Sequence, residues 1–302
     1  MKSKSPGLLV LFVFLFVAEA CNKQQDKPAA NVQTQPLKEA ILATLQRPNH
    51  IVIAILENHG YPQIIGSGSA PYINSLVNDP YSANFISSYA IEHPSQPNYL
   101  DLYSGSNQGV TDDDHPSNEP FNTANLGRQL INAGKSYATY SESLPKVGYN
   151  GDAYGYYVRK HNPAANWMGT GTRQIPSTTN KPFTAFPTDY TKLPTVSIVV
   201  PNLINDMHDG SIGKGDTWLK NHLNNYVKWA KTHNNLFILT FDEDNGNYSN
   251  HIVTIFIGAM VKHSQYSIKI NHYNLLRTIE DMYKLPYAGK AANVNPITRC
   301  WK

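Results

Sequence analysis

Four continuous apolar runs of strand length restrict the fold of this chain more than any other feature of its sequence. They cover residues 50–56, 196–200, 236–240 and 252–257. Continuous rather than alternating apolar residues are typical of strands that are covered on both faces. We therefore expect a central sheet that lies between two other layers.

Three segments between or after these runs carry the apolar spacing of helices. They cover residues 125–133, 218–232 and 273–283, and the last has Leu275, Leu276, Ile279 and Met282 on one face. Buried strands that alternate with helices predict an α/β fold, here a three-layer α/β/α sandwich with a mostly parallel sheet. With 302 residues, of which 41% are hydrophobic, the chain has enough apolar material for one large core.

The N-terminal residues have the pattern of an export signal. Lys2 and Lys4 precede an apolar run over residues 8–18, which is too short to stay in a bilayer as a spanning helix. We expect a signal peptide over residues 1–20, a polar tether over residues 21–38 that is too poor in apolar residues to fold alone, and a folded domain over residues 39–302. The protein is then exported, either to the periplasm or the membrane surface of a bacterium or as a secreted protein.

Two interpretations of Cys21 remain open. In the first, the small residues before it resemble a bacterial lipobox, so that Cys21 carries a lipid anchor; Glu19 is unusual at its position in such a motif. In the second, cleavage after Ala20 leaves Cys21 to form a disulfide with Cys300, the only other cysteine. We favour the lipoprotein interpretation.

Acidic residues directly follow two of the apolar runs. Glu57 and Asn58 come after the first run, and Asp242 and Glu243 come just after the third. Ligands of open α/β sheets bind at the carboxyl ends of the strands, and carboxylate and amide oxygens suit a hard divalent cation. Helix caps or solvated loops are the alternative interpretation of each pair alone, but two such pairs favour a metal site.

A serine between two prolines is the candidate nucleophile. Ser95 precedes Asn98 and an apolar stretch of helical character, so that its hydroxyl is expected near a helix N-terminus, where a phosphate binds well. An ordinary turn is the alternative. His208 and His161 follow further along the chain, and an imidazole near a phosphate can stabilise its oxygens or protonate a leaving alkoxide.

Eight motifs in order resemble the acid phosphatase and phospholipase C family, which belongs to the alkaline phosphatase superfamily. They are residues 56–59 (Leu-Glu-Asn-His), 70–74 (Ala-Pro-Tyr-Ile-Asn), 93–99 (His-Pro-Ser-Gln-Pro-Asn-Tyr), 140–142 (Tyr-Ser-Glu), 160–163 (Lys-His-Asn-Pro), 201–208 (Pro-Asn-Leu-Ile-Asn-Asp-Met-His), 240–243 (Thr-Phe-Asp-Glu) and 272–280 (His-Tyr-Asn-Leu-Leu-Arg-Thr-Ile-Glu). The resemblance extends over about residues 50–286 and implies the three-layer fold with a metal-activated nucleophile.

The resemblance also implies roles for particular residues. The expected metal ligands are Glu57, Asn58, Ser95, Asp242 and Glu243. Ser95 is the expected nucleophile; His208 and His161 are expected to contact the phosphate and the leaving group, and Asn98 a phosphate oxygen. The superfamily's archetypes bind two zinc ions with more Asp and His ligands, a set that is not evident here, so we expect one divalent ion of unknown identity. His251 and His272 lie in family motifs but receive no role.

The expected function is metal-dependent hydrolysis of small phosphomonoesters through a phosphoserine intermediate. A phospholipase C or another phosphodiesterase is the first alternative, and a non-catalytic surface binding protein is the second. The formal net charge of +3 gives no indication of a nucleic-acid partner. The physiological substrate, the pH optimum and the oligomeric state are left open by the sequence.

Overall fold

The computed structural model describes Met1 and residues 45–302. The predicted signal peptide beyond Met1, the tether and Cys21 lie outside the described residues, so these predictions and the pairing of Cys21 with Cys300 stay predictions. Within the described part of the chain, no helix is long and apolar enough to cross a membrane.

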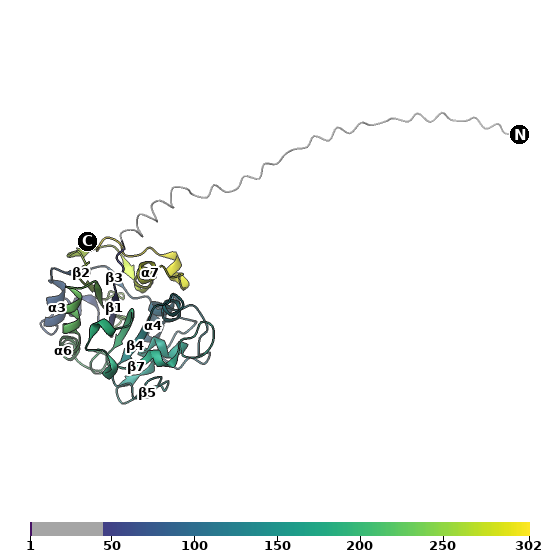
Figure 1. The fold of residues 1–302 in the computed structure, drawn as a ribbon, viewed down its shortest axis with the longest axis horizontal. Helices are drawn as coiled ribbons and strands as arrows, with labels where there is room; N and C mark the ends of the chain where they lie inside the picture. The colour runs from purple at the N-terminus through teal and green to yellow at the C-terminus, as the bar shows by residue number, and fades with distance from the viewer. Residues whose placement is uncertain (2–44) are drawn as a thin grey trace. The chain divides into compact units, whose positions relative to one another are not determined.

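The described residues form one large sheet of eight strands (Figure 1). These strands are β1 (His50–Leu56), β2 (Ser82–Phe85), β4 (Tyr137–Ser141), β7 (Asn180–Pro182), β8 (Val196–Val200), β9 (Asn235–Phe241), β10 (Thr254–Ile257) and β11 (Ser264–Tyr266). Their order across the sheet is β11-β2-β10-β9-β1-β8-β4-β7. Only β10 runs antiparallel to both of its neighbours, whereas all the other pairs are parallel. The predicted mostly parallel sheet is therefore confirmed.

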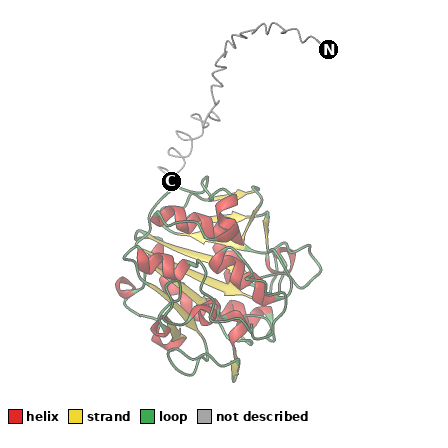
Figure 2. Ribbon diagram, turned by 90° about the vertical axis from the view of Figure 1, so that its right-hand side faces the viewer, coloured by secondary structure: helices red, strands yellow, loops and turns green. Residues whose placement is uncertain are grey.

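Helices cover both faces of this sheet and complete the predicted three layers (Figure 2). One face carries α4 (Ser95–Ser104), α5 (Leu126–Asn132) and α7 (His272–Tyr283), and the other carries α2 (Tyr61–Ile64), α3 (Pro71–Val77) and α6 (Ile212–Ala230). Two small sheets pair β3 (Ser88–Tyr89) with β12 (Ile270–Asn271) and β5 (Ala153–Tyr154) with β6 (Tyr157–Val158). Short 3₁₀ turns cover Arg159–His161, Pro163–Trp167, Ser177–Thr179, Phe183–Ala185, Tyr190–Lys192 and Gly289–Asn293.

The central strand β1 shows why its sequence is continuously apolar. Ile51, Ile53 and Ile55 enter the core beneath α4 and α7, whereas Val52, Ala54 and Leu56 enter the core on the opposite face. Successive side chains of a strand point to opposite faces, so a strand with a core on both sides needs an apolar residue at every position. The polar residues that follow β1 are thereby brought to the edge of the sheet.

Helix α6 begins six residues before its predicted start. Ser211 caps it, because its side chain accepts a hydrogen bond from Lys214 N. Asp216, in the first turns of α6, is buried and accepts hydrogen bonds from Tyr72 N at 3.0 Å and Ile73 N at 2.8 Å. These bonds satisfy backbone donors at the start of α3, which have no partner inside that helix. The carboxylate thus joins two helices on one face of the sheet.

Glu280 gives a testable pH dependence of stability. It is fully buried on α7 and accepts a hydrogen bond from Ala288 N at 2.7 Å, and burial raises the pKa of its carboxyl to about 8. Folding therefore favours the protonated acid, so this contribution to the free energy of unfolding is present below about pH 4.5 and is lost as the pH rises through about 8. We expect Glu280→Gln to be relatively more stable at about pH 9 than at about pH 5, as measured by urea unfolding against wild type.

The Asp114→Asn protein is the control for this experiment, because Asp114 is exposed and lies outside the core. Parallel stability curves for Glu280→Gln and wild type over this pH range would contradict the assignment.

Candidate active site

Polar residues at the ends of three neighbouring strands meet at one edge of the sheet. Glu57 and Asn58 follow β1, and Asp242 follows β9, its parallel neighbour. The backbones are joined there: Asp242 N donates to Leu56 O at 3.0 Å, and Glu57 N donates to Asp206 O, in the loop after β8, at 2.9 Å. Asn58 adopts a φ of 53° and donates its N–H to Asp242 Oδ1 at 3.1 Å. The predicted edge of the sheet therefore gathers acids from three strands.

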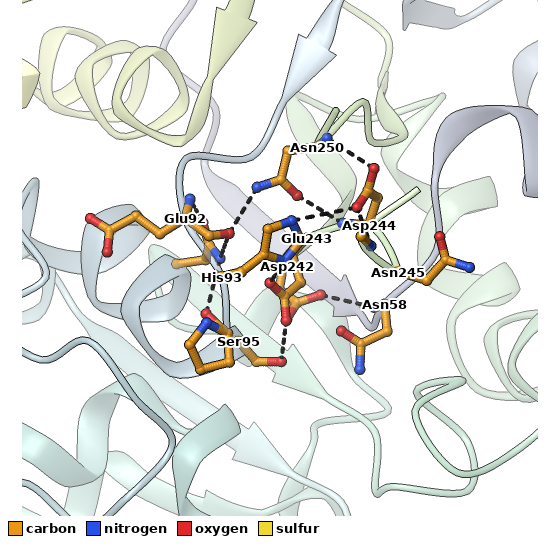
Figure 3. Close-up of polar contacts among 12 residues, drawn as sticks. Asn58, Glu92, His93, Ser95, Asp242, Glu243, Asp244, Asn245 and Asn250 are labelled. Carbon is orange, nitrogen blue, oxygen red and sulfur yellow. Dashed lines mark hydrogen bonds and ion pairs between the residues drawn. The ribbon is translucent and has the colours of Figure 1, made fainter. Parts of the chain in front are cut away.

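Ser95 is the first residue of α4, and its hydroxyl lies between Glu57 and Glu243; Figure 3 shows the Glu243 side of this arrangement. Its Oγ is 2.9 Å from Glu243 Oε1 and 3.2 Å from Glu57 Oε2, and the residue is 1% exposed. One hydroxyl proton can serve only one carboxylate at a time, so the hydroxyl has a strong acceptor in either orientation. Of the predicted metal ligands, Asn58 joins the group through its backbone N–H.

A second group of buried ligands shares Glu57 with the first. His161 Nδ1 lies 3.2 Å from Asp206 Oδ2 and 3.4 Å from Glu57 Oε1, and one ligand atom from each of the three residues lies within 4.8 Å of the others. The ring of His161 stacks on Tyr99 with centroids 5.4 Å apart, and the Tyr99 hydroxyl donates to Glu57 Oε1. The sequence reasoning missed Asp206 as a member of the site.

The buried acids of the site need a bound cation or bound protons to offset their negative charge. The pKa of Glu57 is raised well above its ordinary value by burial, and repulsion from Asp242 and Asp206 raises it further. Burial also raises the pKa of Asp206 well above its ordinary value, and it raises the pKa of Asp242 to about 6. The pKa of Glu243 is raised to about 8 by burial and by repulsion from Asp242. Crowded carboxylates that resist ionisation in one place are the usual environment of a bound cation.

The residues present fit a divalent metal ion. Asp242 Oδ2 and His161 Nε2 are both buried, and neither has a hydrogen-bond partner within the part of the chain that the structure describes. Burial lowers the pKa of His161 well below its ordinary value, so its ring is neutral and has a lone pair to offer. Buried atoms without partners are costly, and carboxylate oxygens with an imidazole nitrogen are suitable ligands for such an ion.

The other predicted site residues differ in their positions. His208 is at the mouth of the site: its side chain is 27% exposed, its Nδ1 lies 2.7 Å from Asp209 Oδ1, and its ring centroid is 5.5 Å from that of His161. Asn98 is buried and positions the loop before Ser95, because its Oδ1 accepts from the backbone N–H groups of residues 91 and 92 and its Nδ2 donates to the carbonyls of residues 92 and 94. Both amide protons of Asn98 are thus used, and the predicted phosphate contact has no free donor in this structure.

The two histidines without an assigned role both bond to backbone carbonyls. His272, at the start of α7, is buried and donates from Nε2 to Asp242 O at 2.8 Å. His251 donates from Nε2 to Ile86 O at 3.0 Å and stacks between Tyr61 and Tyr89. His272 therefore holds the backbone of a metal-ligand candidate, whereas His251 holds the backbone just after β2.

A lysine and an aspartate that the sequence reasoning did not single out lie beside the candidate nucleophile. Asp113 accepts a hydrogen bond from Gln96 N, the backbone donor next to Ser95, at 3.0 Å through Oδ1, and it pairs through Oδ2 with Lys160 Nζ at 2.7 Å. Lys160 opposes the rise in the pKa of Glu243 that burial causes. The positive charge of Lys160 therefore acts on the site.

The chain matches one protein family and resembles curated phosphatases. It matches the family described as the Phosphoesterase family over residues 84–286. It is 45% identical over 254 residues to a phosphatidylinositol-3-phosphatase of Mycobacterium tuberculosis, and the match covers 83% of this chain and 82% of that protein. It is 33% identical over 226 residues to an acid phosphatase of Aspergillus fumigatus, with 67% of this chain and 48% of that protein covered. The match thus spans about half the length of that acid phosphatase.

Solved structures show the same fold at low sequence identity. A protein in the alkaline phosphatase superfamily from Vibrio parahaemolyticus has a TM-score of 0.55 and 13% identity, and the match covers 85% of this chain and 72% of that one. At this identity the similarity extends to the fold alone, which is the alkaline phosphatase-like sandwich expected from the sequence.

Proposed function

Because the chain belongs to the Phosphoesterase family and is a phosphoric ester hydrolase, we propose that it hydrolyses phosphomonoesters through a phosphoserine intermediate on Ser95, with the help of one divalent metal ion. The observation that carries this proposal is the position of the Ser95 hydroxyl, which is buried at the start of α4 within hydrogen-bond distance of Glu57 and Glu243. A hydroxyl so placed is both oriented and next to groups that can take its proton.

The ion would be held by the five predicted ligands, namely Glu57, Asn58, Ser95, Asp242 and Glu243. His161 and Asp206 are further ligand candidates. Such an ion, when bound, lowers the pKa of a neighbouring hydroxyl and neutralises charge on a phosphate oxygen.

The residues of the chain supply the remaining steps. Ser95 Oγ attacks phosphorus, the alkoxide of the substrate leaves with a proton, and water then hydrolyses the phosphoserine. His208 lies at the mouth of the site, where a leaving group would depart, and it is partly exposed to solvent, so we propose it as the proton donor. His161 is buried against Glu57 and Asp206, which favours a positioning or ligand role over proton transfer to solvent.

The proposed substrate class is taken from a curated relative. The relative from Mycobacterium tuberculosis is named as a phosphatidylinositol-3-phosphatase, and it matches this chain over most of both lengths. We propose that a phosphate monoester on an inositol lipid belongs to the substrates of this chain, beside small soluble monoesters. Phosphodiester hydrolysis and a binding role without catalysis remain the alternatives that the experiments distinguish.

Lys160 is proposed to stabilise the transition state. When they are ionised, the four acids of the site carry more negative charge than one divalent ion balances; they are Glu57, Asp206, Asp242 and Glu243. A bound phosphate adds further negative charge. Lys160→Ala is expected to lower kcat by about 10²-fold, as the loss of one preorganised donor does. The rate with a soluble aryl phosphate measures this, and Lys146→Ala, an exposed lysine elsewhere, is the control. Equal rates for the two variants would exclude this role for Lys160.

The proposed function is tested by hydrolysis of 4-nitrophenyl phosphate with the purified full chain, before and after treatment with a chelator. Release that needs a divalent ion supports the proposal. Release only from bis(4-nitrophenyl) phosphate would instead make the protein a phosphodiesterase. Release from neither compound, with any divalent metal or at any pH, would leave the binding role.

A further inference from the structure

A cavity of about 690 Å³ lies apart from the catalytic centre. Strands β3 and β12, the start of α7 and the C-terminal segment form its walls, and none of the proposed metal ligands lines it. Its volume is in the range of ordinary small-molecule sites. Apolar side chains make up much of its lining, namely Phe85, Ile91, Tyr266, Ile268, Ile270 and Ile297.

The charges around this cavity are all of one sign. Lys269 and Arg299 line it and are exposed, and no aspartate or glutamate is among the described residues that line it. Lys269 Nζ lies 4.8 Å from the ring centroid of Tyr89. Neither cation has a carboxylate partner among residues 45–302. Two unpaired cations beside an apolar hollow complement a ligand with an anionic head and an apolar body.

Three asparagine side chains of the wall are already bonded to the protein. Asn271 Oδ1 accepts from the N–H groups of Tyr273 and Asn274, and Asn274 accepts from Asn271 N and donates to Asn295 O at 2.9 Å. Asn250 accepts from Asp244 N and donates to Glu92 O (Figure 3). These amides hold the wall in place, and apolar contact and the two cations are the proposed means of recognition.

We propose that this cavity binds an amphiphilic anion, with an apolar chain or ring inside the hollow and a single carboxylate or phosphate head at Lys269 and Arg299. The site is distinct from the catalytic centre and requires neither Ser95 nor a metal ion. Through Asn250 its wall is joined to the loop that carries Glu92, His93 and Pro94 to Ser95, so the ligand lies against a segment that the active site shares.

The test is calorimetric titration of the purified full chain with sodium dodecanoate below its micellar concentration. One molecule is expected to bind, in wild type and equally in Ser95→Ala. The double variant Lys269→Ala/Arg299→Ala is expected to weaken binding by about 10-fold or more, and Thr298→Trp, which adds bulk inside the cavity, is expected to abolish it. Lys220→Ala is the matched control, because Lys220 is an exposed lysine of α6 on the other face of the sheet.

Two further probes separate the parts of the ligand. Octyl glucoside has an apolar chain without a charge, and inorganic phosphate has a charge without a chain; both are expected to bind at least about 10-fold more weakly than dodecanoate. Unchanged binding of dodecanoate to a double variant with a native circular dichroism spectrum would overturn the proposal. Uptake of many molecules per chain, equal in wild type and Thr298→Trp, would overturn it as well, since that is surfactant adsorption.

Discussion

The Ser95→Ala protein is expected to fold normally and to lose turnover of an aryl phosphomonoester by about 10⁴-fold or more. Removal of a covalent nucleophile leaves only the catalysis that binding and electrostatics provide. The side chain contributes one hydroxyl to a polar site and little to the apolar core, so the free energy of unfolding should change little. Acid-quenched wild-type protein should also carry a phosphate on the peptide that contains Ser95, as measured by mass spectrometry.

Ser106→Ala provides the control at the other end of α4. Ser106 accepts a hydrogen bond from Gln108 N and lies just beyond the helix, so its loss should leave the rate near that of wild type. A folded Ser95→Ala protein with near-normal turnover would exclude Ser95 as the nucleophile. A loss of turnover without a phosphopeptide in wild type would instead favour direct attack by water.

The strands were predictable because burial on both faces leaves a simple pattern. The strands β1 (His50–Leu56) and β8 (Val196–Val200) have the predicted bounds. The strand β9 (Asn235–Phe241) is one residue longer at each end than the predicted run. The direction of β10 was not predictable, since a continuous apolar run has the same pattern in a parallel and in an antiparallel strand. The start of α6 was missed because Gly213 and Gly215 lower helix propensity, which the cap at Ser211 and the tertiary contacts of Asp216 offset.

The site was predictable where its residues directly follow a strand, and less so where loops supply them. Glu57 and Asp242 are fixed by the ends of adjacent parallel strands. Asp206 lies in the turn after β8, and only the fold brings it beside His161. A local motif also cannot tell a ligand-binding amide from a structural one: Asn98, three residues after Ser95, bonds to its own loop. The link between Asp113 and Lys160 spans 47 residues and leaves no local pattern.

The second large effect is expected for Asp206→Asn, which should lower turnover by about 10³-fold and weaken metal binding. Asp206 lies 3.2 Å from His161 Nδ1 and is fully buried, and its other oxygen accepts from His208 N at 2.8 Å. Asparagine keeps the size and can keep that backbone bond, but it removes the negative charge. The expected loss exceeds the about 10- to 100-fold cost of a residue that only orients a ligand, because the change removes a ligand candidate and one of the two acids beside His161.

The control is Asp189→Asn, in the segment before β8, where the carboxylate is 51% exposed and pairs with Lys192. Turnover and the metal content of dialysed protein should stay near wild type there, because a solvated pair contributes little. If Asp206→Asn lost turnover but kept full metal content, Asp206 would act by holding His161 rather than as a ligand. If both variants kept wild-type turnover, the buried group of Glu57, His161 and Asp206 would not belong to the active site, and the ion would depend on the acids around Ser95 alone.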